Sequence, residues 1–166
     1  MPATIDLENA EAWVRGVDKQ TRSAVILGLQ SAALRGVQTI VAEIIPSRSP
    51  RPFDRGIYQM GWRAKSRDDG ADIENLEPHA VFIEYGVRAG NVKIGKRMID
   101  ALTEWVNRKG IGEKGKGASV AWAIAKSMQK RGIFGPKGMG ILKEYVDKHL
   151  KRQVDEEIAR ELAKVK

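Results

Sequence analysis

The N-terminal third of the chain has the apolar spacing of a helix. Between residues 18 and 45, hydrophobic side chains recur every three or four positions, which predicts one long amphipathic helix. Asp18 is placed to cap its start, and Pro46 is expected to end it. Gly28 and Gly36 share nearly the same face, so a neighbouring element is expected to approach closely there. The apolar face consists of Val25, Leu29, Ala32, Ala33, Gly36, Val37, Ile40, Val41 and Ile44.

The middle of the chain has the signals of short strands. Residues 46–56 contain three prolines and end in a glycine, which indicates a surface loop. Residues 57–65 and 71–75 are predicted to form a hairpin whose turn ends in Asp-Gly. The apolar run 80–85 is predicted to form a third strand that leads into a glycine turn. These segments predict a small antiparallel sheet over about 57–87.

The C-terminal half, residues 96–165, is predicted to be helical. A helix is expected over 97–109, because its apolar side chains fall on one face and a glycine follows it. Ser119 is placed to cap a second helix over 120–131. A last amphipathic helix is predicted from residue 141 to about 165.

These elements together predict an α+β fold. Its small antiparallel sheet would pack against the long N-terminal helix and two to three C-terminal helices. A chain of 166 residues, with 42% hydrophobic and 30% charged side chains, fits a single globular domain, 1–166. Each tryptophan lies on an apolar face, so core packing is expected of Trp13, Trp62, Trp105 and Trp122.

The positive charge is distributed unevenly along the chain. The formal net charge is +8, yet residues 1–87 hold 10 Lys and Arg against 12 Asp and Glu, and the rest hold 19 against 9. The excess is densest over residues 93–137, with 11 basic and 3 acidic side chains. Such a segment suits contact with a polyanion, and a solvated basic face is the alternative.

Few residues are available for catalysis or metal binding. The chain contains no cysteine, and its two histidines, His79 and His149, lie far apart without metal-site spacing. The glycine-rich segment 112–117 lacks the Lys-Ser/Thr ending of a phosphate-binding loop. We therefore expect no enzyme activity, no cofactor and no metal. No uninterrupted apolar run reaches bilayer length, so no membrane contact is expected.

Glu84 is a carboxylate among apolar neighbours and admits two interpretations. As a catalytic group it would need a second acid, a metal or a histidine nearby, and the spacing selects none of Asp54, Glu77 and His79. As a structural group it would accept hydrogen bonds from backbone amides or from Arg55 or Arg88 and would hold the turn at Gly86. The structural interpretation is preferred.

Two segments resemble short motifs of a known family. The segment PFDRGIYQMGWRAK resembles a P-x-D-x-G-x-L-x-x-S-W pattern, and EPHAVFIEYGVRAG resembles P-Y-A-x-x-V-E-F-G-T-R. With the helices on either side, this order is similar to the tailed-phage tail-completion or head–tail neck family, small virion proteins often described as minor tail components. The matching positions that carry this resemblance are Asp54, Gly56, Tyr58, Trp62, His79, Ala80, Glu84, Tyr85, Gly86 and Arg88.

The resemblance implies a structural role in the virion. Members of this family assemble in the host cytoplasm into a ring between the portal or connector and the tail-tube proteins. A hexamer is favoured here, and a dodecamer would suit a portal-proximal tier. The motif residues Asp54, Gly56, Trp62, Glu84, Gly86 and Arg88 are expected to anchor a subunit contact or a local turn. Basic residues facing the channel would hold packaged DNA without reading its sequence, with Lys93, Lys96, Arg97, Lys114 and Lys116 as candidates.

Ring closure needs two different complementary surfaces on each subunit. The unequal charge of the two halves predicts that a negative front half meets a positive back half of the next copy, in a contact that high salt would weaken. One alternative function is a stand-alone basic nucleic-acid-binding protein, supported by the sequence pI of about 9.8. Another is a hydrolase that uses Glu84 with an unidentified partner.

Overall fold

The computed structural model describes residues 19–49, 56–135 and 137–165. It is a mixed helical and sheet structure, which confirms the predicted α+β class. Contacts within the chain form two compact units. We call residues 1–81 with 140–166 the scaffold unit, and residues 82–139 the hairpin unit. The expectation of a single domain stays a prediction.

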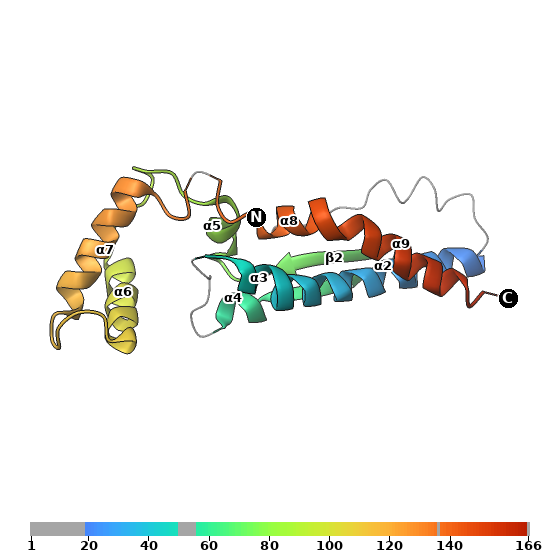
Figure 1. The fold of residues 1–166 in the computed structure, drawn as a ribbon, viewed down its shortest axis with the longest axis horizontal. Helices are drawn as coiled ribbons and strands as arrows, with labels where there is room; N and C mark the ends of the chain where they lie inside the picture. Colours follow the sequence, from blue (N-terminus) through green and yellow to red (C-terminus); the bar gives the residue numbers. More distant parts are fainter. Residues whose placement is uncertain (1–18, 50–55, 136, 166) are drawn as a thin grey trace. The chain divides into compact units, whose positions relative to one another are not determined.

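The predicted long helix forms as three consecutive segments (Figure 1). They are α2 (Lys19–Thr39), the π-helical turn η1 (Ile40–Ile44) and α3 (Ile45–Ser47). Pro46 does not end the helix where expected, because it lies at the start of α3, directly after the π-helical turn η1, and the chain stays helical through it. The helix ends at Ser47, since Arg48 is extended. Asp18, the expected cap, lies outside the described residues.

The C-terminal helix runs beside α2 (Figure 1). It consists of α8 (Ile141–Tyr145), the π-helical turn η2 (Val146–Leu150) and α9 (Lys151–Leu162). The buried side chains Val25 and Leu29 of α2 form the centre of this contact. Val154, Ile158 and Leu162 of α9 pack against them. By length and composition Lys19–Ser47 could cross a membrane, but half of that apolar window is buried within the protein, as expected of a core helix.

Both glycines of α2 permit the close approach expected from their spacing. A Cβ on Gly28 would lie 2.7 Å from Ile158 Cα and 2.9 Å from Ile158 N, so the backbone of α9 crosses directly over this position. A Cβ on Gly36 would lie 2.6 Å from Ile73 Cδ1 and 2.7 Å from Tyr145 Cζ. Only glycine leaves room for the helix at the first position and for the Tyr145 ring at the second.

Polar contacts also join α2 to the C-terminal helix. The buried Tyr145 hydroxyl lies 3.2 Å from Gln153 Oε1, and Gln153 Nε2 donates to Thr39 Oγ1 at 2.8 Å. Burial raises the pKa of Tyr145 to about 12. Nearer the solvent, Arg35 donates to Glu156 at 2.6 Å and to Glu157 at 3.1 Å. These contacts orient α9 on α2 more specifically than apolar packing alone.

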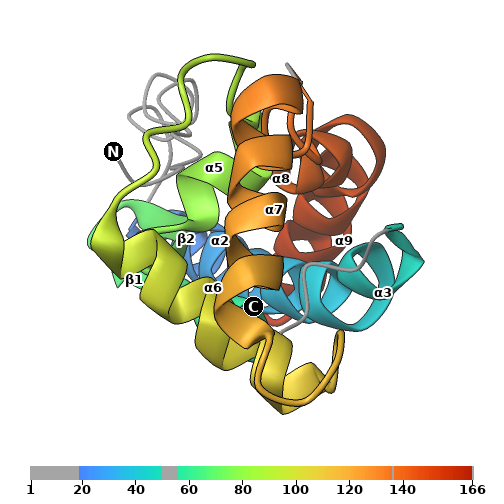
Figure 2. The same cartoon turned by 90° about the vertical axis from the view of Figure 1, so that its left-hand side faces the viewer.

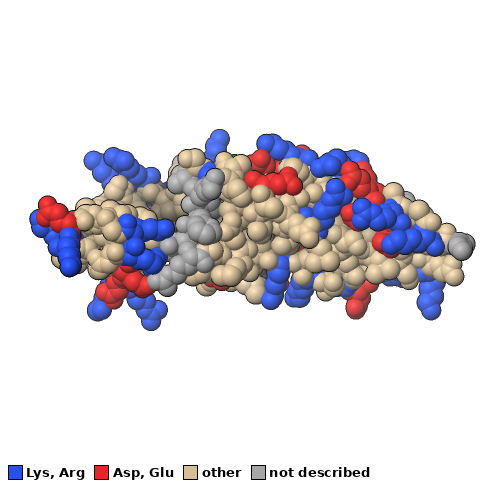
Figure 3. All heavy atoms as spheres, turned by 60° about the horizontal axis from the view of Figure 1, so that its bottom comes forward, with Lys and Arg blue, Asp and Glu red and all other residues tan. Residues whose placement is uncertain are grey.

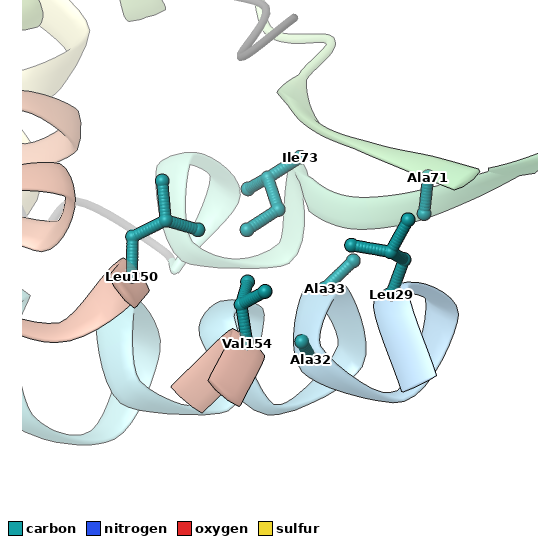
Figure 4. A pocket seen from close by; sticks show the side chains of 7 residues that line it. All are labelled: Leu29, Ala32, Ala33, Ala71, Ile73, Leu150 and Val154. Atoms are coloured by element: carbon teal, nitrogen blue, oxygen red, sulfur yellow. The ribbon is translucent and has the colours of Figure 1, made fainter. Parts of the chain in front are cut away.

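The predicted hairpin is confirmed, and it covers α2. Strand β1 (Trp62–Arg67) pairs antiparallel with β2 (Gly70–Asn75), and the Arg67–Gly70 pair leaves Asp68 and Asp69 as the turn. Every residue of β2 is buried. Where β2 faces the helices, a small void of about 10 Å³ remains, which Figure 4 shows from close by. Its lining is apolar: Leu29, Ala32, Ala33, Ala71, Ile73, Leu150 and Val154.

The prediction that a strand begins at residue 57 is wrong. Ile57–Met60 is the helical turn α4, which starts after Gly56, a residue with φ of +71°. A helical turn places residues four apart on one side, and Tyr58 meets Trp62 edge to face with ring centroids 5.9 Å apart. In a strand these two side chains would be about 13 Å apart. The aromatic contact therefore fits a helical turn over these residues and not a strand.

The prediction of a third strand over residues 80–85 is also wrong. Ala80–Tyr85 forms the helix α5. Its buried residues are Ala80, Ile83 and Glu84, whereas Phe82 and Tyr85 are exposed, which is the spacing of a helix and not the alternation of a strand. A short apolar run fits either pattern, so the sequence alone could not distinguish them. The sheet in the described residues consequently has two strands.

Candidate nucleic-acid interface

The hairpin unit is built from two helices that lie side by side (Figure 2). They are α6 (Lys96–Lys109) and α7 (Gly117–Arg131). Their contact is closed by Val106, Ala121 and Ala125, all fully buried. Small side chains on α7 allow α6 to approach closely and pack without voids.

Glycines determine both ends of the loop between α6 and α7. Gly110 takes the left-handed conformation with φ of +65° and ends α6, as its position predicted. Gly117 begins α7, and a Cβ there would overlap the Asn107 side chain. Ser119 was expected to cap α7 but lies inside its first turn, where its hydroxyl donates to the Lys116 carbonyl at 2.8 Å. Because the helix starts earlier, the cap position belongs to Lys116.

The chain enters and leaves the hairpin unit through a tightly packed base. Val87 and Ile133 exchange two backbone hydrogen bonds, each 2.9 Å long. The Met139 N–H donates to the Ile83 carbonyl at 2.8 Å. Three glycines with positive φ fit between these backbones, where any Cβ would overlap a carbonyl oxygen of the opposite segment: Gly86, Gly132 and Gly138. The base is thus a backbone joint that tolerates no side chain at these points.

The family-motif residues have separate positions. Gly86 belongs to the base, and Glu84 contributes its carbonyl oxygen, against which Gly138 packs; the Glu84 side chain is buried. Arg88 is exposed just beyond the joint. In the scaffold unit, Gly56 precedes α4 and Trp62 is buried at the start of β1. Asp54 and Arg55 lie outside the described residues. The motif therefore contributes to two local structures.

The two units differ sharply in charge. The hairpin unit holds 12 Lys and Arg against 4 Asp and Glu, a net of +8, and the remainder holds 17 of each, a net of zero. All of the formal net charge thus belongs to residues 82–139. On the face drawn in Figure 3, basic and acidic side chains are interspersed over the scaffold unit, while basic ones predominate over the hairpin unit at the left. A polyanion would therefore be attracted to the hairpin unit.

The five basic candidates divide between the two ends of this unit. Lys93, Lys96 and Arg97 are exposed near the base, at or before the start of α6. Lys114 and Lys116 are exposed in the loop at the opposite end of the helices. Lys96 pairs with Asp100 at 2.8 Å, which raises the pKa of Lys96, and Lys116 pairs with Glu113. The candidates are therefore two sets, and one cation of each set already has an acidic partner.

Sequence reasoning missed the cations of α7. This helix contains three cations and no acidic residue. In the part of the chain that the structure describes, no ion pair engages Lys126, Lys130 or Arg131. The absence of any Asp or Glu over 117–131 was the signal that could have identified this helix.

One tryptophan also departs from its expected position. Trp62 is buried and Trp105 is half-buried, but Trp122 on α7 is 48% exposed, so core packing does not account for it. Trp13 lies outside the described residues. The Lys126 Nζ atom lies over the Trp122 ring, 5.8 Å from its centroid.

Little in the described residues suggests catalysis. Within residues 19–49, 56–135 and 137–165, no cluster of three or more His, Asp or Glu could hold a metal ion. The Nδ1 atom of His79 lies 3.8 Å from Glu77 Oε2, and the imidazole ring is tilted against the Tyr58 ring. His149 stacks on the Tyr145 ring with centroids 6.3 Å apart. Both histidines thus have aromatic neighbours that account for their positions, and the absence of enzyme activity stays a prediction.

Comparison of the chain with protein-family models, with curated proteins and with solved structures found no match. The resemblance to phage neck proteins therefore remains a hypothesis that depends on the short motifs.

Proposed function

We propose that the chain is a structural subunit of a tailed-phage neck, which joins head to tail as a closed ring around DNA. The scaffold unit forms the body of the ring, and the hairpin unit holds the phosphate backbone of the passing DNA. The observation that carries the proposal is the separation of charge, a net of +8 in one unit and zero in the other. The motif order provides the phage context.

The charge separation suits a protein that must both self-associate and contact DNA. A uniformly basic subunit would repel its neighbours in a ring, whereas a neutral body avoids that repulsion. The fold also changes how the ring contact is expected to form. Residues 140–166 join residues 1–81 in a unit with no net charge. Attraction between a negative front half of one copy and a positive back half of the next is therefore not expected to hold the ring together.

Apolar side chains on the scaffold surface offer a substitute for that attraction. Leu27 and Leu34 are 52% and 59% exposed on one side of α2, and Met60 is 74% exposed on α4. Contacts between copies through such residues would persist at high salt, unlike contacts between opposite charges. The ring is therefore expected to resist high salt.

Negative-stain microscopy and analytical ultracentrifugation of the purified full chain test the ring. The decisive comparison pairs two variants with equal charge loss. One replaces Lys93, Lys96, Arg97, Lys114 and Lys116 with Gln, and its control replaces Lys19, Lys65, Lys143, Lys148 and Lys151 in the scaffold unit. Both are expected to form rings, and only the hairpin variant is expected to bind DNA more weakly and with a smaller salt dependence. A protein that stays monomeric in all conditions contradicts the proposal.

The same measurements separate the neck from the stand-alone nucleic-acid-binding protein, which the basic hairpin unit also supports. Tight DNA binding by the monomer, with a salt slope of about −4 or steeper, would favour the stand-alone protein. Ring formation with weak binding by the monomer favours the neck. In particles, Glu84→Ala is expected to yield tailless heads beside free tails, because it removes a buried side chain next to the packed base of the hairpin unit. Normal infectious particles would remove Glu84 from any essential role.

A further inference from the structure

The outer side of α7 presents an unusual combination of side chains. Trp122, Lys126 and Lys130 follow at intervals of four residues, so each is displaced by only about 40° around the helix from the one before. They therefore lie along one side, with about 6 Å of helix between successive positions. Figure 2 shows α7 running beside α6.

Packing within the hairpin unit does not explain Trp122. The α6–α7 contact is closed by Val106, Ala121 and Ala125, and the indole of Trp122 keeps 48% of its surface exposed. Exposing so large an aromatic side chain forgoes burial that would contribute roughly 2 kcal/mol. The exposed indole is better explained as a contact surface for a partner.

The chemistry around the indole indicates which partner. The Lys126 ammonium group lies over one face of the ring at 5.8 Å. Neither Lys126 nor Lys130 has an acidic partner among the described residues, and α7 itself contains no acid. An aromatic ring followed along the helix by two cations without acidic partners matches a ligand that alternates flat aromatic groups with negative charges. Unpaired nucleotides of a nucleic acid have that composition.

We propose that the Trp122 side of α7 binds a single-stranded segment of nucleic acid. One base stacks on the Trp122 indole, and phosphates of the strand that continues along the helix meet Lys126 and then Lys130. Stacking needs a base face that is not covered by neighbouring base pairs, so the surface prefers a single strand to a duplex. This goes beyond the proposed function, which requires only contact with the backbone of duplex DNA, and it does not depend on ring formation.

Fluorescence anisotropy with the full chain tests the preference. The probes are labelled oligothymidine of about 20 nucleotides and a blunt duplex of the same length, which exceed the usual site size per domain. Trp122→Ala is expected to weaken binding of the single strand by about ten-fold, because loss of one stacked base costs about 1–3 kcal/mol. Trp122→Phe is expected to keep most of the affinity for the single strand. In both Trp122 variants, the affinity for the duplex is expected to change by less than about two-fold.

The lysines are expected to act differently from the tryptophan. Replacing Lys126 and Lys130 with Gln should lower the affinity for both probes, and it should reduce the salt slope for the single strand by about 0.7 for each phosphate that a lysine no longer neutralises. Trp122→Ala should leave that slope unchanged. Leu34→Ala is the matched control, since Leu34 is another large exposed apolar residue, 59% exposed, in the neutral unit. Circular dichroism of each variant verifies its fold.

Several outcomes would overturn this inference. It fails if Trp122→Ala binds the single strand as tightly as the original chain does, or if the duplex is preferred. It also fails if the protein ignores oligonucleotides but binds vesicles of phosphatidylglycerol through Trp122, because the surface would then fit a lipid headgroup layer. Sedimentation of the same samples keeps the two proposals separate. Intact rings without a single-strand preference refute only this inference, and single-strand binding by a permanent monomer refutes only the neck.

Discussion

Replacing Gly28 with alanine tests the closest helix contact in the scaffold unit. The added methyl group would lie 2.7 Å from Ile158 Cα and 2.9 Å from Ile158 N. Carbon atoms in favourable contact are about 3.5 Å apart or more, so α9 has to retreat by roughly 0.8 Å. The clash involves backbone atoms, and rotation of a side chain cannot relieve it.

The retreat of α9 weakens the apolar contact around this point. A gap of about 0.5–1 Å removes a quarter to a half of the dispersion energy between facing atoms, here Val25 and Leu29 against the apolar residues of α9. Overpacking of this kind costs about 1–3 kcal/mol. The helix preference of alanine over glycine returns about 1 kcal/mol. Since the backbone cannot move locally, we expect an overpacking cost of about 3 kcal/mol. The free energy of unfolding should therefore fall by about 2 kcal/mol in all.

Urea unfolding followed by circular dichroism measures this loss, and the melting temperature should fall by about 4–8 °C. Gln38→Ala on the exposed side of α2 is the control, expected to change stability by less than about 0.5 kcal/mol. Ile158→Val added to Gly28→Ala should not restore stability, because trimming the side chain leaves the backbone clash in place. A Gly28→Ala protein that is as stable as the original chain, or more stable, refutes the close contact between α2 and α9.

Three further perturbations have defined outcomes. The methyl group added by Gly138→Ala should overlap the Glu84 carbonyl and open the base of the hairpin unit, whereas the one added by Gly135→Ala meets no atom within 4 Å. Hydrogen exchange at the Val87 and Ile133 amides should therefore accelerate about ten-fold more in Gly138→Ala than in Gly135→Ala. Equal exchange rates in both variants would contradict the packed base. The pKa of Tyr145 is about 12 in the folded state and 10.0 in the unfolded state. The stability that this difference contributes, roughly 3 kcal/mol, is therefore complete below pH 10.0 and is lost as the pH rises toward 12. Tyr145→Phe should remove this alkaline loss, and an unchanged profile from pH 9 to about 12 would argue against a buried hydroxyl. Val106→Ala leaves a cavity at the fully buried centre of the α6–α7 contact and should destabilise the hairpin unit by about 2 kcal/mol. Limited proteolysis should then cut faster within residues 82–139. Cleavage as slow as in the original chain would show that this contact is not the core of the unit.

The sequence by itself determined the elements whose signals are local. The long N-terminal helix, the hairpin with its turn just before Gly70 and the end of α6 at Gly110 follow from periodicity and from residues with special backbone preferences. The close approach at Gly28 was also predictable, because a glycine on the apolar face of a helix serves few other purposes. The excess of positive charge was likewise visible in the composition.

Only the tertiary structure decided which of two equally allowed local conformations formed. In residues 80–85 the adjacent side chains Ile83 and Glu84 are both buried, which fits a helix and not the alternation of a strand. In residues 57–60 the helical turn brings Tyr58 against Trp62. Neither feature can be read from a short apolar run. The pairing of residues 140–166 with 1–81 likewise depends on contacts between distant segments. That pairing divides the charge into a neutral scaffold unit and a basic hairpin unit, because net charge in space follows the packing of the chain and not its order.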